Sequence, residues 1–188
     1  GIQVSDDIQS GDFSNYMLKP MSYTLYYLFV EFSKNIVRFI VALGIFGIIL
    51  IFYDPDFFNA ALLKNIPFIF ISSVIAYCIA SLMNMIIGIL AFWIVNAKRI
   101  IFMYFAVMSI FSGMTIPLSL FPENIQKIIF MTPLPYTLYV PAQIALNKYN
   151  AIETIKMMGI QALFAIGLFT IIQCVYYLGI KKYEAVGR

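Results

Sequence analysis

The feature that most constrains this chain is a set of long apolar runs. Four of them are candidates for membrane-spanning helices, over residues 36–53, 67–95, 100–117 and 155–180. A run of ~18 residues at ~1.5 Å per residue gives ~27 Å, close to the ~30 Å hydrocarbon core of a bilayer. Charged residues make up only 11% of the chain, against ~25% in soluble domains. The sequence therefore predicts an all-α integral membrane protein, a polytopic helical bundle with four spans in this chain.

The third run ends in a segment that no straight helix accommodates. Ser112 and Gly113 are followed by Pro117 and Pro122, and proline lacks an amide donor and clashes with the preceding turn. This spacing fits an ordinary span end, and it also fits a cavity boundary or a re-entrant turn. Further prolines interrupt the chain at Pro133, Pro135 and Pro141. We expect residues 118–150 to form a re-entrant segment of short helices rather than a span.

Residues 1–35 are predicted to be a polar segment outside the bilayer, ahead of a transmembrane domain over residues 36–188. Asp12 can cap a short helix and Pro20 can end it. One face of that helix would carry Phe13, Tyr16 and Met17, which are spaced by three and four residues. This face is either a docking helix for a partner or a turn packed on the membrane surface.

The next helix is predicted to begin after Ser22, which is a suitable N-cap. It has two stripes at helical spacing. The apolar stripe consists of Leu25, Leu28, Phe29, Phe32 and Ile36, and the opposite stripe of Tyr27, Glu31, Lys34 and Arg38. This amphipathic pattern predicts a helix that begins at the membrane interface.

The basic residues predict the orientation. If four spans alternate, residues 1–35, the turn at 98–99 and the tail 181–188 share one face of the membrane. That face holds Lys19, Lys34, Arg38, Lys98, Arg99, Lys181, Lys182 and Arg188, and the other holds Lys64, Lys127, Lys148 and Lys156. The positive-inside rule makes the richer face cytoplasmic. Residues 1–35 are then cytosolic, and the segment 118–150 is external.

Several function classes are excluded or disfavoured by what the chain lacks. It has no histidine, which rules out a Ser-His-Asp triad and the common zinc motifs within it, and it has no phosphate-binding Gly-rich loop. The predicted spans carry no carboxylate of the kind that couples transport to protons. No basic patch suits nucleic acid. The polar residues inside the spans are mostly expected to bond helix to helix: Ser72, Ser73, Ser81, Asn84, Gln161, Thr170 and Gln173. A secondary transporter or channel subunit, a membrane enzyme and a structural subunit remain as alternatives.

Three motifs, taken in order, resemble those of ABC-2 type exporter permeases. The stretch from Ile8 to Ser22 is similar to the cytoplasmic segment ahead of that family's third span. Ser112-Gly113 with Pro117 and Phe121-Pro122 resembles the end of its fifth span, and the stretch from Pro133 to Pro141 resembles its external re-entrant segment. The resemblance covers nearly the whole chain.

The resemblance implies the transmembrane permease subunit of a bacterial ATP-driven exporter, a multi-pass protein of the cytoplasmic membrane. It implies a second permease copy or a homologous permease as partner, lipid around it, and two cytosolic ATPase subunits that bind ATP and Mg²⁺. The chain itself would then hold no cofactor and no catalytic site. Since the family has six spans, the first two would lie upstream of Gly1.

The resemblance also implies two sets of site residues. The first would couple the permease to its ATPase and consists of Asp12, Phe13, Tyr16, Met17, Lys19 and Pro20. The second would form an external gate and consists of Ser112, Gly113, Pro117, Pro122, Pro133, Pro135 and Pro141. An unidentified substrate would be moved outward.

The orientation is testable with single cysteines. A cysteine at position 97 is expected to be protected from an impermeant maleimide added outside intact cells, whereas one at position 126 is expected to be labelled. The reason is the excess of lysine and arginine on the first face. The reverse labelling pattern would contradict this topology.

Overall fold

The computed structural model describes residues 1–10, 22–36, 41, 60–94 and 97–186. Its described residues form helices and turns, with no strand among them. The predicted span 36–53 lies almost wholly outside them, and so do the proposed coupling positions from Asp12 to Pro20. The longer helices are α1 (Ile2–Ser10), a helix over residues 23–36, α4 (Ala60–Ile89), α5 (Ala97–Phe111) and α8 (Ala151–Val186). The short ones are η2 (Leu90–Phe92), η3 (Leu118–Leu120), α6 (Glu123–Phe130), η4 (Pro135–Thr137) and α7 (Tyr139–Ala145).

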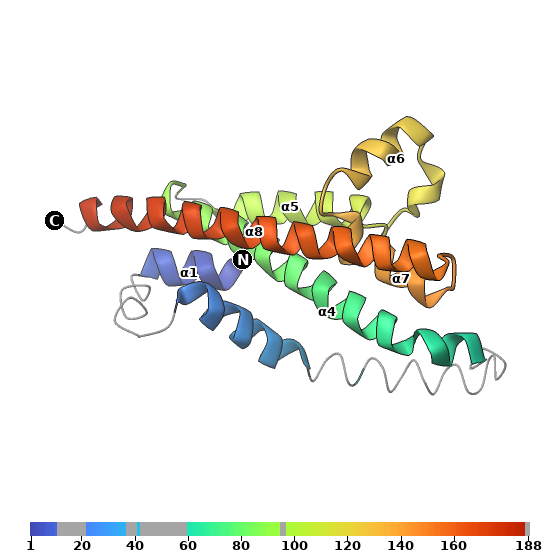
Figure 1. The fold of residues 1–188 in the computed structure, drawn as a ribbon. Helices are drawn as coiled ribbons and strands as arrows, with labels where there is room; N and C mark the ends of the chain where they lie inside the picture. The colour runs from blue at the N-terminus through green and yellow to red at the C-terminus, as the bar shows by residue number, and fades with distance from the viewer. Residues whose placement is uncertain (11–21, 37–40, 42–59, 95–96, 187–188) are drawn as a thin grey trace.

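Two of the described helices, α4 and α8, are long and apolar enough to cross a membrane. Only 28% of the most apolar stretch of Asn65–Ile89 is buried, and 11% of that of Ala151–Gly179. They run in the same direction (Figure 1), because Ser72 bonds Gln161 near their beginnings and Phe92 meets Gly179 near their ends. Helix α5 lies between α4 and α8 in the sequence and runs in the opposite direction (Figure 1). Its apolar stretch, Arg99–Phe111, is shorter. Apolar side chains on the outside of a bundle are what a bilayer requires.

The predicted boundaries of the spans differ from those of the helices. Helix α4 begins at Ala60 and contains Pro67, where the prediction began the span at Pro67. A proline removes one hydrogen bond to the carbonyl four residues earlier, and apolar helices in membranes tolerate this loss. Helix α8 begins at Ala151 and continues to Val186. Helix α5 ends at Phe111, before the predicted end at 117, because the residues after it turn.

Helix α1 is an element that the sequence did not indicate. It packs against α4, η2 and α5, and it buries Val4, Ser5 and Ile8 completely or nearly so. The close approach depends on Gly88 of α4, which lies against the backbone of Gly1 and the side chain of Val4. The beginning of the described chain is therefore packed into the bundle rather than lying on its surface.

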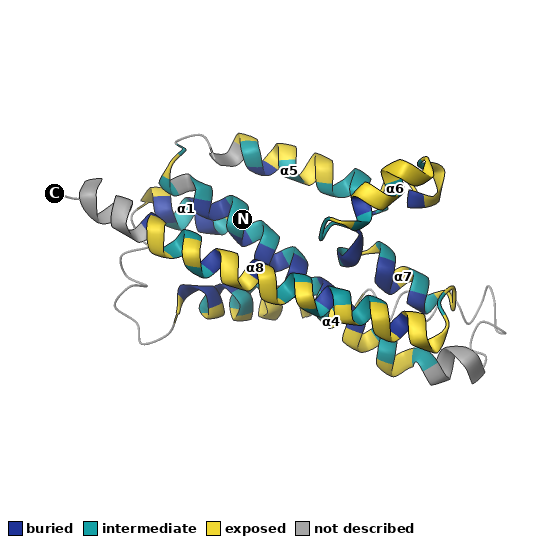
Figure 2. Ribbon diagram, turned by 45° about the horizontal axis from the view of Figure 1, so that its top comes forward, coloured by how far each residue is buried: buried dark blue, intermediate teal, exposed yellow. Residues whose placement is uncertain are grey.

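The helix over residues 23–36 begins as predicted but faces the other way. The Ser22 hydroxyl accepts a hydrogen bond from the Leu25 amide at 3.4 Å, which confirms the N-cap. Tyr27, assigned to the polar stripe, is 1% exposed, while Phe29 of the apolar stripe is 66% exposed. In a bilayer the apolar stripe can face lipid, so the residues with hydroxyl groups turn inward. Figure 2 shows that the outer face of α8 is also largely exposed.

The contact between α1 and α4 is testable at Gly88. In Gly88→Ala the new Cβ would lie 2.6 Å from the Gly1 carbonyl oxygen and 2.8 Å from the Val4 Cβ, and relieving this overlap is expected to cost about 1–3 kcal/mol of unfolding free energy. The matched control is Gly167→Ala in α8, where nothing lies within 4 Å of the added methyl. It is expected to be neutral or stabilising by up to ~1 kcal/mol, because alanine favours a helix. Unfolding in mixed micelles measures both, and equal effects would contradict this packing.

Candidate functional site

The proposed gate begins where α5 ends, and the backbone there requires glycine. Gly113 has a φ of +85°, a region that residues with a Cβ rarely adopt. A Cβ at this position would also lie 3.3 Å from the ring of Tyr139 in α7. The Thr115 amide donates to the Ser109 carbonyl at 2.9 Å, so the last turn of α5 remains satisfied. Ser112, beside the glycine, is 4% exposed.

Two prolines then begin the next short helices. Pro117 precedes η3 with a ψ of 131°, and Pro122 precedes α6 with a ψ of 146°. Proline suits these positions because the first amides of a helix have no partner within it. The side chain of Gln126 donates to the Phe121 carbonyl at 2.8 Å, which fixes the entry into α6. The chain therefore reverses direction through two short helices after α5.

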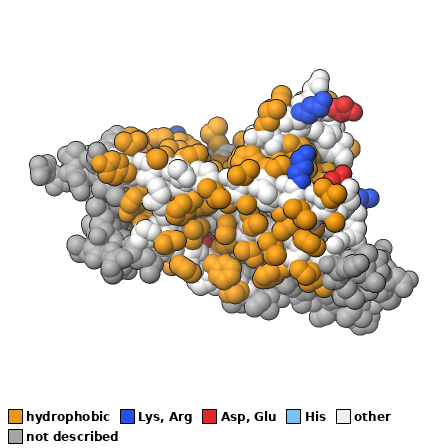
Figure 3. All heavy atoms as spheres, in the orientation of Figure 1, with side chains coloured by type: hydrophobic (Ala, Val, Ile, Leu, Met, Phe, Trp, Pro, Cys, Tyr) orange, Lys and Arg blue, Asp and Glu red, His pale blue; other side chains and the backbone are white. Residues whose placement is uncertain are grey.

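Helix α6 stands away from the rest of the bundle (Figure 1). Its Ile129 is buried, whereas Glu123, Lys127 and Ile128 are exposed. Figure 3 shows that most charged side chains on this face gather around α6 and the beginning of α8, and that hydrophobic side chains cover much of the remainder. Helix α6 is thus amphipathic and is held mainly at its ends.

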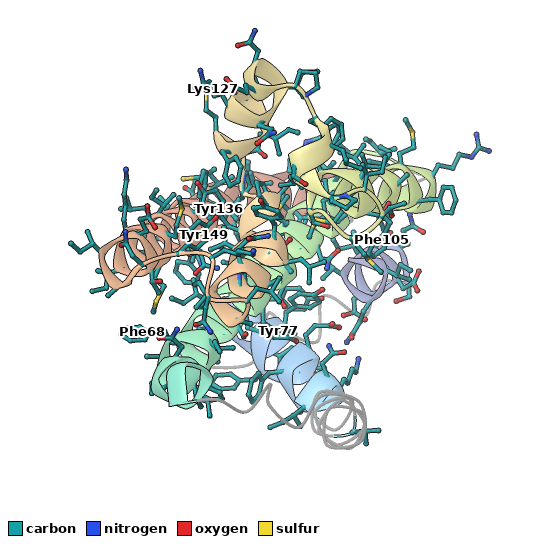
Figure 4. The ribbon with its side chains drawn as sticks, turned by 90° about the vertical axis from the view of Figure 1, so that its right-hand side faces the viewer. Phe68, Tyr77, Phe105, Lys127, Tyr136 and Tyr149 are labelled. Carbon is teal, nitrogen blue, oxygen red and sulfur yellow. The ribbon has the colours of Figure 1, made fainter. Side chains whose placement is uncertain are left out.

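An aromatic cluster joins the end of α6 to the body. The ring of Phe130 meets Tyr136 and Tyr139 edge to face, with centroids 6.2 and 5.7 Å apart. The Tyr136 hydroxyl donates to the Phe130 carbonyl at 3.1 Å, and its ring lies 5.0 Å from Phe164 of α8. Figure 4 places Tyr136 and Tyr149 near each other, with Lys127 on the outer side of α6. Burial raises the pKa of Tyr149, in the turn before α8, to about 12.

The central polar contact of this region is made by Gln161, which is completely buried. Its side-chain oxygen accepts a hydrogen bond from the Ser72 hydroxyl at 2.8 Å. Its amide nitrogen donates to the Tyr136 carbonyl at 2.9 Å and to the Ser72 carbonyl at 3.4 Å. These bonds join α4, η4 and α8, and they confirm the expectation that Ser72 and Gln161 bond helix to helix.

The connection from α7 to α8 is closed by local hydrogen bonds that sequence reasoning missed. Asn147 has a φ of 54°, and the Lys148 amide reaches the Gln143 carbonyl at 3.0 Å, the arrangement of a Schellman cap. Asn150 and Glu153 then bond each other's backbone amides reciprocally, both at 2.9 Å. This is a capping box, and the acidic residue three positions after Asn150 was its signal in the sequence.

A second polar contact ties this connection to α4, since the Asn65 side chain donates to that of Asn147. The beginnings of α4 and α8 are therefore held together at two levels, by Asn65 near the end of the bundle and by Gln161 deeper within it. The short helices between α5 and α8 are attached to this frame.

The structure brings part of the proposed gate together. Ser112, Pro135 and Pro141 are buried, while Pro117 and Pro122 are exposed at the short helices that they begin. Gly113 contacts α7 through Tyr139. Pro133 is half-buried in the turn before η4. The contact of Gly113 with Tyr139 joins the end of α5 to α7, and the role of the seven residues as a gate remains a proposal.

Comparison with known proteins decides the family. The sequence model of a family described as "ABC-2 family transporter protein" matches residues 2–187. The chain belongs to the ABC-2 transporter family. This confirms the resemblance drawn from the three sequence motifs, and with the apolar helices it makes the protein a membrane component of a transport system. No curated protein and no solved structure matches the chain. No group of three or more potential metal ligands occurs among the described residues of this ABC-2 family protein.

The Gln161 contact of this ABC-2 family protein is testable by substitution. Gln161→Leu would leave the Ser72 hydroxyl and the Tyr136 carbonyl buried without this partner, and the expected loss of unfolding free energy is about 1–3 kcal/mol. The matched control is Gln173→Leu, also in α8, because the Gln173 side chain donates a long hydrogen bond to the Thr24 hydroxyl at 3.4 Å. Its expected cost is below ~1 kcal/mol. Unfolding in mixed micelles measures both, and a larger loss in the control would contradict the assignment.

Proposed function

We propose that this protein is the permease subunit of an ATP-driven exporter in the cytoplasmic membrane. The observation that carries the proposal is the match of the ABC-2 transporter family to residues 2–187. The exposed apolar surfaces of α4 and α8 support a position in the bilayer. A second permease, identical or homologous, completes the pathway, and separate ATPase subunits bind ATP and Mg²⁺.

Energy for transport enters through the cytosolic segment. The chain has no phosphate-binding loop of its own, so work has to come through a surface that a separate ATPase contacts. We assign this contact to Phe13, Tyr16 and Met17 of the helix that the sequence predicts between Asp12 and Pro20, with Lys19 beside them. Apolar side chains at a water-facing segment are typical anchors for a partner protein.

We assign the external gate to Ser112, Gly113, Pro117, Pro122, Pro133, Pro135 and Pro141. Within it, α6 with the turns that attach it is the part that moves. Support comes from the contrast between α6, which is exposed along most of its length, and η4 with α7, which pack against α4. An element with few contacts opens at a lower free-energy cost than one that is packed. In the proposed cycle α6 moves about the joints at Gly113 and Phe130, while the segment held by Gln161 stays in place.

The coupling surface is testable by truncation. Phe13→Ala with Tyr16→Ala is expected to weaken association with the proposed ATPase partner by about 2 kcal/mol or more, because anchor side chains are lost. The measurement is co-purification of the two subunits from membranes. The matched control is Phe29→Ala, which removes a ring that is 66% exposed on the 23–36 helix.

The control is expected to retain the ATPase. Unchanged association in the double variant would remove the coupling role from residues 12–20. If the wild-type permease retained no ATPase at all, the exporter proposal itself would be wrong.

A further inference from the structure

The two helices on either side of the proposed coupling segment are joined by side-chain hydrogen bonds. The Lys34 side chain donates to that of Gln3, and a second bond lies nearer the segment. The hydroxyl of Tyr23, at the start of the 23–36 helix, donates to a carboxylate oxygen of Asp7 in α1 at 2.8 Å. Tyr23 is 2% exposed, so the bond is shielded from water on one side. The bond therefore holds the end of α1 to the start of the 23–36 helix. We call this pair of helix ends, with Asp7 and Tyr23, the base of the coupling segment. Figure 1 shows α1 and the first turn of the 23–36 helix side by side.

The same base is attached to α8. The ring of Tyr23 stacks on that of Tyr176, with centroids 6.3 Å apart and planes inclined by 8°. The adjacent Thr24 is 1% exposed, and its hydroxyl accepts a hydrogen bond from Gln173 at 3.4 Å. Two consecutive residues of the 23–36 helix thus contact α8 one turn apart. A displacement of this helix start cannot occur without moving or breaking these contacts.

The base is also attached to α4, through α1. The residues that precede Asp7, Val4 and Ser5, are buried, and Gly88 of α4 lets the two backbones touch. Asp7 is therefore carried by a helix packed on one long helix, while Tyr23 is packed on the other. The Asp7–Tyr23 bond is one of the contacts between these two parts, together with the bonds from Lys34 to Gln3 and from the Gly1 amino group to the Tyr27 hydroxyl.

We propose that Asp7 and Tyr23 act as positioning residues that transmit movement of the ATPase-contacting segment to α4 and α8. This inference rests on the proposed function, since it assumes that residues 12–20 receive the force. A phenol bonded to a carboxylate suits this role because the bond is directional and stronger than one between neutral groups. Apolar contacts alone would let the two helix ends slip, since they have little directional preference.

The inference predicts different effects on two properties, the association of the ATPase and the response of the permease to nucleotide. Neither Asp7 nor Tyr23 belongs to the proposed ATPase contact, so removing their bond is expected to leave association intact. What should be lost is the response of the far end of the bundle to nucleotide. The substitutions are Tyr23→Phe, which keeps the ring stacked on Tyr176, Asp7→Ala, and the two combined.

The experiment uses the full permease with its ATPase in proteoliposomes. Cys78 and Cys174 are replaced by alanine, and Lys127→Cys on the exposed side of α6 reports the far end. The rate of maleimide labelling is measured with and without ATP and vanadate. The matched control is Ser33→Ala, which removes an exposed hydroxyl bonded within its own helix, to the Val30 carbonyl at 2.9 Å.

The nucleotide-dependent change in labelling rate is expected to fall about tenfold in each single variant. The double variant should lose no more than either single one, since both remove the same bond. Co-purified ATPase should stay within twofold of wild type, and melting temperature in detergent should shift little in Tyr23→Phe. The control should behave as wild type in every measurement.

Other outcomes would overturn the inference. A full nucleotide response in both single variants, or losses that add in the double variant, would show that the bond transmits nothing. A lower melting temperature that accounts for the reduced response would make the role structural only. A wild-type complex with bound ATPase and a nucleotide response keeps the proposed function in place in each of these cases. A wild-type permease that binds no ATPase would refute the proposed function instead.

Discussion

The hydrogen bonds of Gln161 are the interaction on which the arrangement of this bundle depends. A side-chain amide buried among apolar residues is costly unless its groups are paired, and here three bonds pair them. Because these bonds are directional, they set the register between α4 and α8 and the height of η4 beside them. The positions of α7, of the aromatic cluster around Tyr136 and of α6 follow from that register. A leucine in place of Gln161 would fill the same space but would not determine the positions of these elements.

Polar and aromatic contacts decide how the helices pack, because apolar side chains are about as stable against lipid as against another helix. Exposed apolar side chains cover α5 and α8, and in a bilayer they gain little by turning inward. Close backbone contact at small residues is the other source of specificity. At Gly179 of α8 an added Cβ would lie 2.5 Å from the ring of Phe92 in η2, so the absence of a side chain there lets this ring pack on α8. The reversed face of the 23–36 helix has the same origin, since Tyr27 gains more from an internal partner than Phe29 does.

The class of fold could be predicted from the sequence, because apolar length and the proline pattern are local properties. The helix break near Ser112 and Gly113, the N-cap at Ser22 and the helix-to-helix bonding of Ser72 and Gln161 were indicated by residue type, although the pairing of these two was not. The packing of α1 could not be predicted, because the sequence of a short polar helix does not tell its buried face from its solvent-exposed face. The start of α4 was misplaced because a proline within a helix looks like a boundary. In the candidate site, the residues of the turns could be predicted. The cluster around Tyr136 could not, because it depends on contacts between segments that are distant in the sequence. Asn150 and Glu153 have the spacing of a capping box, which the sequence analysis did not use.

The shared direction of α4 and α8 has an electrostatic consequence. Each helix carries a macrodipole equivalent to roughly half a positive elementary charge at its beginning and half a negative one at its end. In a parallel pair these fields add, so the end of the bundle near Asn65 and Asn147 is the more attractive to anions. Glu153 in the first turn of α8 offsets one of the two fields, and the first turn of α4 has no acidic residue. The pair of α4 and α8 is therefore polarised along its length by its backbone alone, and α5, which runs the other way, opposes part of this field.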